Sequence, residues 1–530
     1  MDAVTGDAAR GIGECDARSF VGRRVAGDSL TTAPPSAPRA LPPHLSMLFN
    51  SYAFAAFLAV VLPLYYALGH RWQNRMLLLA SYVFYGWWDP RFLLLLWLST
   101  VVDFFVARRM TATADQRARR RLMVLSVTLN LAYLGFFKYF DFFADSAREA
   151  IAAFGWQADP ITLRVLLPVG ISFYTFQAIS YIVDVYRNAR EHTDDFVAFA
   201  LYLAYFPHLV AGPIQRSTQL LPQLLVPRRV TAEQISSGAL LMLVGFFKKI
   251  AIADAVAPMV NSIFGNSASR SGPTLLVGVY LFAVQIYGDF SGYTDIARGV
   301  SRLMGIELRV NFRQPYLSRN IAEFWRRWHI SLSEWLRDYL YISLGGNRGP
   351  RWTTYRNLLL TMLLGGLWHG AAWTFVVWGA LHGLYLAVHR AVTSARRVGA
   401  RGANDASPDR ADRPTSAAGW LWYGASVLVT FHLVCLAWVF FRAPTIQEAG
   451  EYLVGIVTQP GPLSSDARIM ALVYLPLTLL LDLPAWWRGD EQPISPRWPA
   501  LVRGVVYGVM IACCLWVGAQ QGAPFIYFRF

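Results

Sequence analysis

The sequence contains few charged residues for its length. Only 15% of its 530 residues are Asp, Glu, Lys or Arg, whereas 55% are hydrophobic, and the mean hydropathy is +0.35. A soluble protein of this size needs more charge to cover its surface. Apolar runs of about 18 residues or more recur along most of the chain, a length that crosses a bilayer as a helix. The composition therefore excludes an ordinary soluble enzyme and predicts an all-α, multi-pass membrane protein.

Lysine is almost absent. Of the 48 basic residues only Lys138, Lys248 and Lys249 are lysines, which leaves 45 arginines. A GC-rich genome explains such a bias, although guanidinium groups also bind phosphate in bidentate fashion. We favour the genomic explanation for most of the arginines. The net charge of +15 does not indicate nucleic-acid binding, because the basic residues lie in short loops between apolar runs, as in membrane proteins.

Cysteine is rare, and a cleavable signal peptide is missing. The four cysteines show neither metal-binding spacing nor a disulfide framework, and they fit small packing residues: Cys15, Cys435, Cys513 and Cys514. Residues 1–46 are polar and rich in Pro and Arg, with no apolar core. Met47 begins a different kind of sequence that runs into an apolar segment. We interpret 1–46 as a disordered extension or a misassigned start.

Twelve apolar segments are candidate spans, at 48–68, 76–88, 91–107, 122–140, 164–186, 196–214, 236–257, 273–296, 355–388, 419–441, 469–487 and 502–519. The break at Asp89-Pro90 predicts a tight helical hairpin over 76–107. The segment 355–388 is too long for one straight crossing and contains Gly365, Gly366 and Gly370, so we expect it to be tilted or broken.

The loops predict the orientation and the domains. Six arginines in 108–121 place that loop in the cytoplasm, so the first span runs from outside to inside. Residues 47–389 form the predicted core. A polar loop at 390–418 is expected to be flexible, and 419–530 supplies further helices of the same domain.

Residues 285–348 interrupt the apolar pattern. Asp289 and Asp295 lie near the end of an apolar run, where a carboxylate is costly unless it is paired. The stretch 322–341 has helical periodicity with Arg326 and Arg327 beside its apolar face, which predicts interfacial or re-entrant helices on the cytoplasmic side. An amphipathic surface helix with snorkelling arginines and a docking surface for an anionic donor explain this stretch equally well.

His369 is the most conspicuous polar residue within an apolar segment. It lies in the sequence LGGLWHGAAW, where small residues let neighbouring helices or a substrate approach closely. A neutral imidazole can accept and return a hydroxyl proton, yet intramembrane histidines commonly serve as hydrogen-bonding links between helices. The residue pattern alone slightly favours the structural role. His329 and His382 are secondary candidates for which we also favour a structural role. No nucleophile elbow, phosphate-binding loop, zinc motif or dinucleotide fingerprint appears in context.

Long sequence motifs indicate the fold and function of the chain more specifically than its composition does. They run through 47–530 as MLFNSYAF, LPVGISFYTFQAISYIVDVYR, FPHLVAGPIQR, GFFKKIAIAD, DFSGYTDIARG, NFRQPYLSRNIAEFWRRWHISLSEWLRDYLYI, LLGGLWHGAAWTFVVWGALHG, WVFFRAPT and PFIYFRF. In this order they resemble the membrane-bound O-acyltransferase family, most closely its bacterial branch with the membrane subunit of alginate O-acetylation. Residues 1–46 and 390–418 lie outside the resemblance.

The resemblance implies a fold and a site. The fold is a ring of about 11–12 helices with re-entrant elements around a central tunnel. His369, in the WHG motif, corresponds to the active-site histidine of the family, and His329 to its second characteristic histidine. Donor or substrate contacts are expected from six further residues: Asp289, Asp295, Arg326, Arg327, Trp328 and Trp368.

The resemblance also implies a reaction and a setting. An acetyl group would pass from a cytoplasmic thioester, acetyl-CoA, to hydroxyls of an exported polysaccharide, with no bound cofactor and no metal. Periplasmic acetyltransferase or polysaccharide-modification proteins are the expected partners, and the bacterial inner membrane the expected location. D-alanyl transfer to teichoic acid, acylation of another acceptor such as cellulose or a secondary metabolite, and transport remain alternatives. Transport is weakened because no repeated halves are found.

Overall fold

The protein is described by a computed structural model that covers residues 47–156, 166–399 and 413–518. The chain divides between Pro42 and Pro43, and all described residues belong to the unit that begins at Pro43. The predicted extension 1–46 and residues 400–412 of the predicted loop lie outside the described residues.

The described residues form helices and no strands, which confirms the all-α prediction. The first half contains α1 (Tyr52–Ala67), α2 (His70–Gly86), α3 (Arg91–Thr111), α4 (Gln116–Leu134), α5 (Phe140–Ala153), α6 (Ile171–Tyr186), α7 (Phe196–Ala204), α8 (Phe206–Leu209), α9 (Ser217–Leu225), α10 (Ala232–Phe246) and α11 (Ala255–Gly265). The second half contains α12 (Gly272–Leu303), α13 (Ile321–Arg327), α14 (Ile330–Trp335), α15 (Arg351–His369), α16 (Trp373–Gly399), α17 (Ala417–Arg442), α18 (Ile446–Thr458), α19 (Ser465–Arg488) and α20 (Ala500–Gly518).

Short π-helical and 3₁₀ segments lie between or extend these helices: η2 (Gly135–Tyr139), η3 (Phe247–Asp254), η4 (Ser267–Ser269), η5 (Pro315–Leu317) and η6 (Leu336–Tyr341). Six helical segments of the described chain are long and apolar enough to cross a membrane: 116–153, 272–303, 373–394, 417–442, 465–488 and 500–518. The multi-pass architecture is thereby confirmed.

Two predicted interruptions occur where the sequence suggested them. α2 ends at Gly86 and α3 begins at Arg91, on either side of Asp89-Pro90. The long segment 355–388 is broken, because α15 ends at His369 and α16 begins at Trp373. Since the break follows directly after His369, the histidine occupies the end of a helix rather than its middle.

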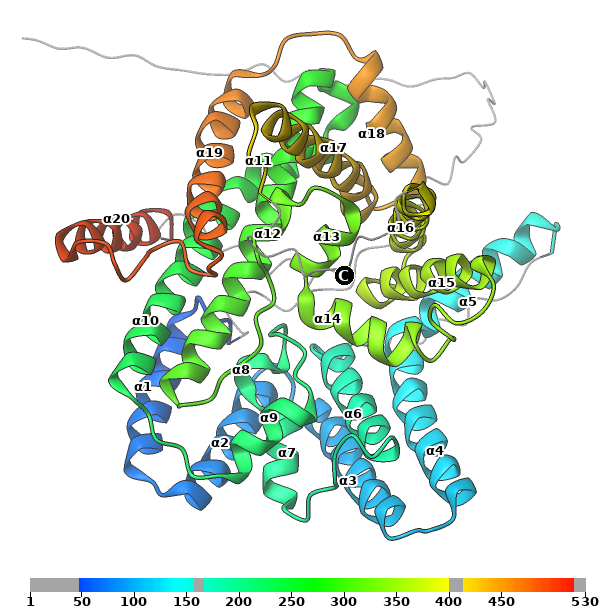
Figure 1. Ribbon diagram of the computed structural model, residues 1–530, viewed down its shortest axis with the longest axis vertical. Coiled ribbons are helices and arrows are strands. Elements are labelled where there is room, and N and C mark those ends of the chain that lie inside the picture. Colours follow the sequence, from blue (N-terminus) through cyan, green and yellow to red (C-terminus); the bar gives the residue numbers. More distant parts are fainter. Residues whose placement is uncertain (1–46, 157–165, 400–412, 519–530) are drawn as a thin grey trace, which may run out of the picture. The chain divides into compact units, whose positions relative to one another are not determined.

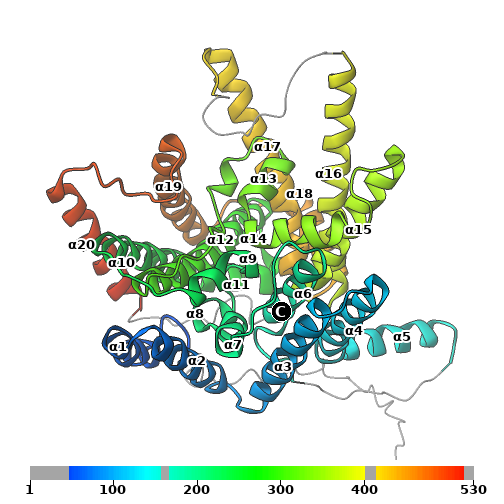
Figure 2. The same cartoon turned by 60° about the horizontal axis from the view of Figure 1, so that its bottom comes forward.

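Three boundaries differ from the prediction. Residues 285–303 are the second half of α12, a 32-residue helix, because lysines of η3 neutralise its carboxylates. The helical periodicity of 322–341 is interrupted: the expected helices are present as α13, α14 and η6, and His329 separates the first two with a left-handed backbone, φ of 43°. The expected loop at 390–418 is shorter, since α16 continues to Gly399 and α17 begins at Ala417. In Figure 2 these two helix ends extend beyond their neighbours.

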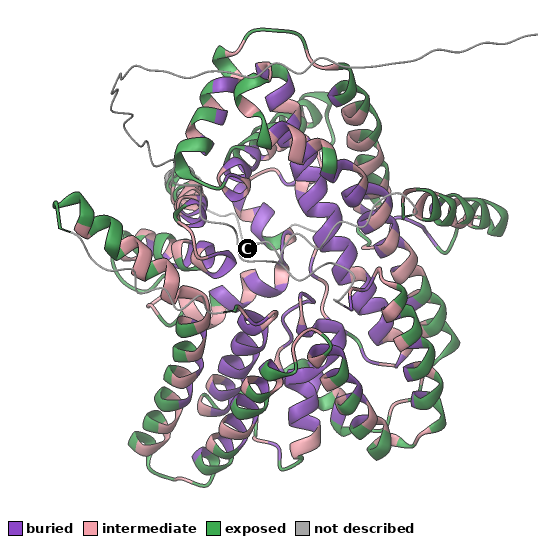
Figure 3. Cartoon of the chain, turned by 180° about the vertical axis from the view of Figure 1, so that it is seen from behind, coloured by how far each residue is buried: buried purple, intermediate pink, exposed green. Residues whose placement is uncertain are grey.

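α12 is the central helix of the described unit. In its most apolar window 83% of residues are buried, against 6% for α20, whose exposed side chains fit contact with lipid. Figure 1 shows α12 between α10, α13 and α19, and Figure 3 shows buried residues concentrated along it. Gly245 of α10 and Gly292 of α12 face each other's carbonyl oxygens, so that a Cβ on either would lie under 3 Å from an oxygen. Glycine thus permits the two backbones to touch.

The predicted cytoplasmic ends of the helices lie together. The Arg119 guanidinium at the start of α4 donates to Asn188 Oδ1 (2.7 Å), just after the end of α6. The Arg228 guanidinium donates to Asn74 Oδ1 (2.7 Å) and to the Tyr65 hydroxyl (2.9 Å), near the α1–α2 turn. This grouping is consistent with the orientation that the arginine-rich loops predict.

Glycine also sets the distance between α15 and α16, and substitution there tests its importance. A Cβ on Gly366 would overlap the carbonyl oxygen of Phe375, so we expect Gly366→Ala to push the helices apart and destabilise the protein by about 1–3 kcal/mol. Gly424→Ala, in α17, is the matched control, because a Cβ there meets nothing within 4 Å. Thermal unfolding of both variants in detergent measures the effect. Equal melting temperatures would contradict this view of the hairpin.

Candidate active site

His369 is the last residue of α15 and is only 4% exposed. Its imidazole lies among aromatic rings, with ring-centre distances of 5.0 Å to Trp368, 5.0 Å to Trp378 and 5.4 Å to Phe441. An apolar, almost dry environment favours the uncharged imidazole, which is the form that can accept a proton.

His329 lies beside His369, although forty positions separate them in sequence. The centres of the two imidazole rings are 6.3 Å apart, and His329 is fully buried. The left-handed backbone at His329 turns the chain sharply between α13 and α14. Such a conformation in a non-glycine residue is unfavourable and is characteristic of functional sites. The structure therefore brings together the two histidines that the sequence singled out.

Asn311 determines which nitrogen of the His329 ring carries the hydrogen. Its Oδ1 accepts hydrogen bonds from the backbone N–H (3.2 Å) and the hydroxyl (2.8 Å) of Ser331, so the atom facing those donors is the oxygen. The same oxygen lies 3.2 Å from His329 Nδ1, which must therefore carry the hydrogen. His329 Nε2 is left as a lone-pair acceptor, and no hydrogen bond reaches it from the described residues.

The two tryptophans that were predicted to contact donor or substrate have different surroundings. Trp368 contacts both histidines, with ring-centre distances of 5.0 Å to His369 and 5.9 Å to His329, and so forms part of the wall of the site. Trp328 packs against Phe312, Phe324 and Trp438 and is fully buried. Its surroundings are those of a packing residue next to His329.

The four charged residues predicted to bind substrate lie mostly in ion pairs. Asp289 pairs with Lys249, and Asp295 with Lys248, both at 2.8 Å. The Arg327 guanidinium is 2.9 Å from the Glu323 carboxylate, whereas the Arg326 side chain is exposed. These pairs link α12 to η3 and brace α13. A donor contact stays a prediction for these residues, and Arg326 is the one on an exposed surface.

His382, a secondary candidate from the sequence, lies in α16 and is fully buried. Its ring packs against aromatic rings of α13 and α16. Its ring centre lies 4.7 Å from Trp378 and 5.1 Å from Trp325, and neither ring nitrogen has a hydrogen bond from the described residues. Trp378 lies between His382 and His369, so aromatic packing explains its position.

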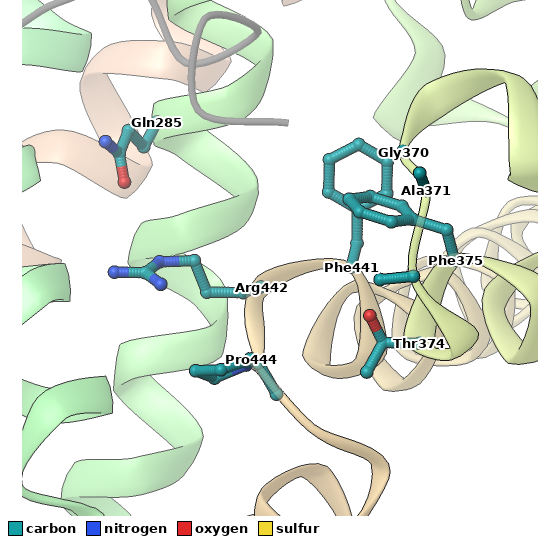
Figure 4. A pocket seen from close by; sticks show the side chains of 10 residues that line it. Gln285, Gly370, Ala371, Thr374, Phe375, Phe441, Arg442 and Pro444 are labelled. Carbon is teal, nitrogen blue, oxygen red and sulfur yellow. The ribbon is translucent and has the colours of Figure 1, made fainter. Parts of the chain in front are cut away.

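A pocket of about 390 Å³ lies next to His369. Its lining comes from α12, from the α15–α16 turn and from the end of α17: Gln285, Gly370, Ala371, Ala372, Thr374, Phe375, Phe441, Arg442, Ala443 and Pro444. Figure 4 shows the Phe375 and Phe441 rings together, with Gln285 and Arg442 on the other side. Phe441 lies against His369, so the pocket reaches within one aromatic ring of the imidazole.

Sequence reasoning missed three residues of this site. Lys138 and Tyr139, from the π-helical turn η2, donate hydrogen bonds to the last carbonyl groups of α15. Asn311 holds His329. One feature of the sequence could have drawn attention to Lys138: it is a charged residue in an apolar stretch, in a chain with only three lysines.

The chain is similar in sequence to a known protein family and to several named enzymes. Residues 187–400 match the model of the membrane-bound O-acyltransferase family. The probable alginate O-acetylase of Pseudomonas aeruginosa is 46% identical over 76% of this chain and 73% of its own length. That of Azotobacter vinelandii is 43% identical over 91% of this chain and all of its own length.

The chain belongs to the membrane-bound O-acyltransferase family. It is an O-acyltransferase, and both histidines lie within the matched region. A peptidoglycan O-acetyltransferase of Helicobacter pylori is also similar, at 37% identity over 78% of this chain and 80% of its own length. Enzymes named for different acceptors, alginate and peptidoglycan, are thus similar to this chain.

The pH dependence of acyl transfer tests the state of His329. Burial lowers the pKa of His329 from about 6.5 to about 3, so the ring gains its charge only when the pH falls through about 3. We expect the ratio of the wild-type rate to the His329→Gln rate to stay constant between pH 5.5 and 8, a window above that pKa. Acyl-transfer rates in membrane vesicles measure it. A ratio that falls toward pH 5.5 would show that His329 titrates in this range.

Proposed function

We propose that this O-acyltransferase moves an acetyl group from a cytoplasmic thioester, acetyl-CoA, to hydroxyls of an exported polysaccharide of the alginate type. The observation that carries the proposal is the buried pair His369–His329, next to a pocket that reaches within one aromatic ring of His369. The relatives are named as alginate O-acetylases, which suggests the acetyl group and the alginate acceptor.

The chemistry of the pair suits acyl transfer to a hydroxyl. The acceptor hydroxyl gives its proton to the imidazole of His369 while its oxygen bonds to the thioester carbonyl carbon. The carbon–sulfur bond then breaks, and the thiol leaves with the proton. His329, whose Nδ1 carries hydrogen, offers its Nε2 lone pair as a hydrogen-bond acceptor to the acceptor hydroxyl or to the departing thiol.

The two substrates approach from opposite faces in this proposal. Arg326 is the exposed cation of α13 and would meet the phosphates of the donor at the cytoplasmic side. The pocket beside Phe441 has a volume typical of small-molecule sites and would receive the acceptor, or a partner protein that carries the acetyl group onward. The bacterial inner membrane is the location that fits a cytoplasmic donor and an exported product.

A bacterial strain that lacks the gene for this protein provides the test. We expect the deletion to remove O-acetyl esters from the extracellular polysaccharide and the full-length gene to restore them, as measured by mass spectrometry of the purified polymer. Labelled acetyl-CoA supplied to inverted vesicles should lose its acetyl group in the same strains. Unchanged acetylation in the deletion strain would overturn the proposed acceptor.

Peptidoglycan is a second candidate acceptor, because one relative is named a peptidoglycan O-acetyltransferase. The same deletion strain distinguishes peptidoglycan from the extracellular polysaccharide as the acceptor. Loss of O-acetyl groups from muramic acid, with the extracellular polymer unchanged, would assign the enzyme to the cell wall.

A further inference from the structure

The end of α15, which presents His369, is held by a neighbouring turn. The Lys138 ammonium donates to the carbonyl oxygens of Trp368 and His369, the latter at 3.3 Å, and lies 3.5 Å from the Ser172 hydroxyl. The Tyr139 hydroxyl donates to the carbonyl oxygen of Leu367 (2.9 Å). Three of the last carbonyl groups of α15 therefore receive hydrogen bonds from two consecutive residues.

Those carbonyl groups need partners from outside the helix. The last four carbonyl groups of an α-helix have no partner within it, and a helix that ends inside a protein must satisfy them in another way. After α15 the chain continues through Gly370 in an extended conformation, with φ of −158° and ψ of 149°. A cation at this position also complements the negative end of the helix dipole.

The π-helical turn η2 directs both side chains to the same helix end. A π-helical turn adds a residue to the helical repeat, and such turns are frequent at functional sites. η2 covers Gly135–Tyr139, between α4 and α5. Figure 1 shows α5, which continues directly from η2, beside α15, and the hydrogen bonds of Lys138 and Tyr139 join η2 to the end of α15.

A lysine suits this position better than the arginine that prevails elsewhere. The chain uses arginine at 45 of its 48 basic positions, yet a lysine occupies this one. An ammonium group is a compact point charge with three donors, and three oxygens surround Lys138 Nζ. The planar fork of a guanidinium does not converge its donors on one point.

We propose that Lys138 is a positioning residue for acyl transfer: its ammonium fixes the carboxyl end of α15 and thereby holds the His369 imidazole against His329. The inference rests on the proposed function, because it assigns the pair to catalysis. Lys138 acts through the backbone of Trp368 and His369 and does not itself touch substrate. Tyr139 assists by holding Leu367.

Lys138→Met tests the proposal in membrane vesicles that contain the full-length protein. We expect kcat to fall about 10–100-fold per folded molecule, since a misplaced catalytic group costs that much, with the KM for acetyl-CoA unchanged. Lys138→Arg, which keeps the cation but cannot converge its donors on the three oxygens, should recover only part of the rate. Hydrogen exchange of the amides at 366–370 should become faster in Lys138→Met, because the helix end is no longer held.

Arg119→Met is the matched control, since Arg119 lies in the first turn of α4, nineteen positions before Lys138, and its guanidinium donates to Asn188 Oδ1. It should leave exchange at 366–370 and the KM for acetyl-CoA unchanged. Wild-type kcat and wild-type exchange in Lys138→Met would overturn the proposal, as would faster exchange with unchanged kcat. If the wild-type protein transfers no acetyl group while exchange at 366–370 still rises in Lys138→Met, the proposed function fails and the anchoring of α15 stands.

Discussion

Replacing His369 by alanine should reduce acyl transfer by about 10²–10⁴-fold, the contribution typical of a general base. His369 is the one histidine at the end of α15, and its imidazole contacts both His329 and the wall of the pocket through Phe441. Because the side chain packs against rings, alanine leaves a small cavity, while the bonds from Lys138 and Tyr139 to the backbone of the helix end are kept. O-acetyl content of the polysaccharide, normalised to immunoblotted protein, measures the effect.

His432→Ala is the control for this experiment. His432 lies in α17 and its Nε2 is 2.8 Å from the Tyr280 hydroxyl, so it represents the helix-linking role that intramembrane histidines often play. We expect normal acetylation in this variant. Equal acetylation in His369→Ala and in His432→Ala, at equal protein levels, would assign His369 to packing and refute its role as the base.

Replacing Asn311 by leucine should also cause a large loss, of about 100-fold or more. The leucine cannot accept the hydrogen of His329 Nδ1, so the ring is free to change its tautomer and its orientation, and loss of the partner that orients a catalytic histidine can cost up to about 10⁴-fold. The buried Ser331 N–H also loses its acceptor. Single-turnover acetyl transfer in vesicles measures the loss.

Two further variants separate orientation from stability. Ser331→Ala removes one donor to Asn311 Oδ1 but leaves the bond to His329, so we expect less than about a tenfold loss, as for a residue remote from the reacting atoms. The double variant Asn311→Leu with His329→Ala should be no worse than His329→Ala alone, because both act through one ring. Additive losses would mean that Asn311 contributes through stability instead.

Sequence reasoning succeeded where a pattern has one physical meaning. The apolar runs predicted an all-α multi-pass protein, and six segments of the described chain are long and apolar enough to cross a membrane. The glycines of 355–388 indicated the break between α15 and α16. The histidine pair came from the family motifs rather than from periodicity, which had slightly favoured a structural role for His369. The structure adds the missing spatial fact, a ring separation of 6.3 Å.

Other features could not be inferred from local patterns. Asp289 and Asp295 looked like the edge of a membrane segment, but their partners Lys249 and Lys248 are about forty positions earlier in the chain. Their pairing lets α12 continue to Leu303. Likewise, the left-handed conformation of His329 interrupts a sequence with helical periodicity, because the tertiary contacts to Asn311 outweigh local propensity.

The aromatic rings packed around His369 bear on the energy supply of the cell. A membrane potential drives protons inward with about 2.3 kcal/mol per charge per 100 mV, so any continuous file of water through this enzyme would short-circuit respiration. Trp368, Trp378 and Phe441 surround the imidazole at ring distances of 5.0–5.4 Å. The packing that shields the imidazole from water on these sides therefore also opposes proton leakage along them, while the proposed donor and acceptor reach the site from opposite faces.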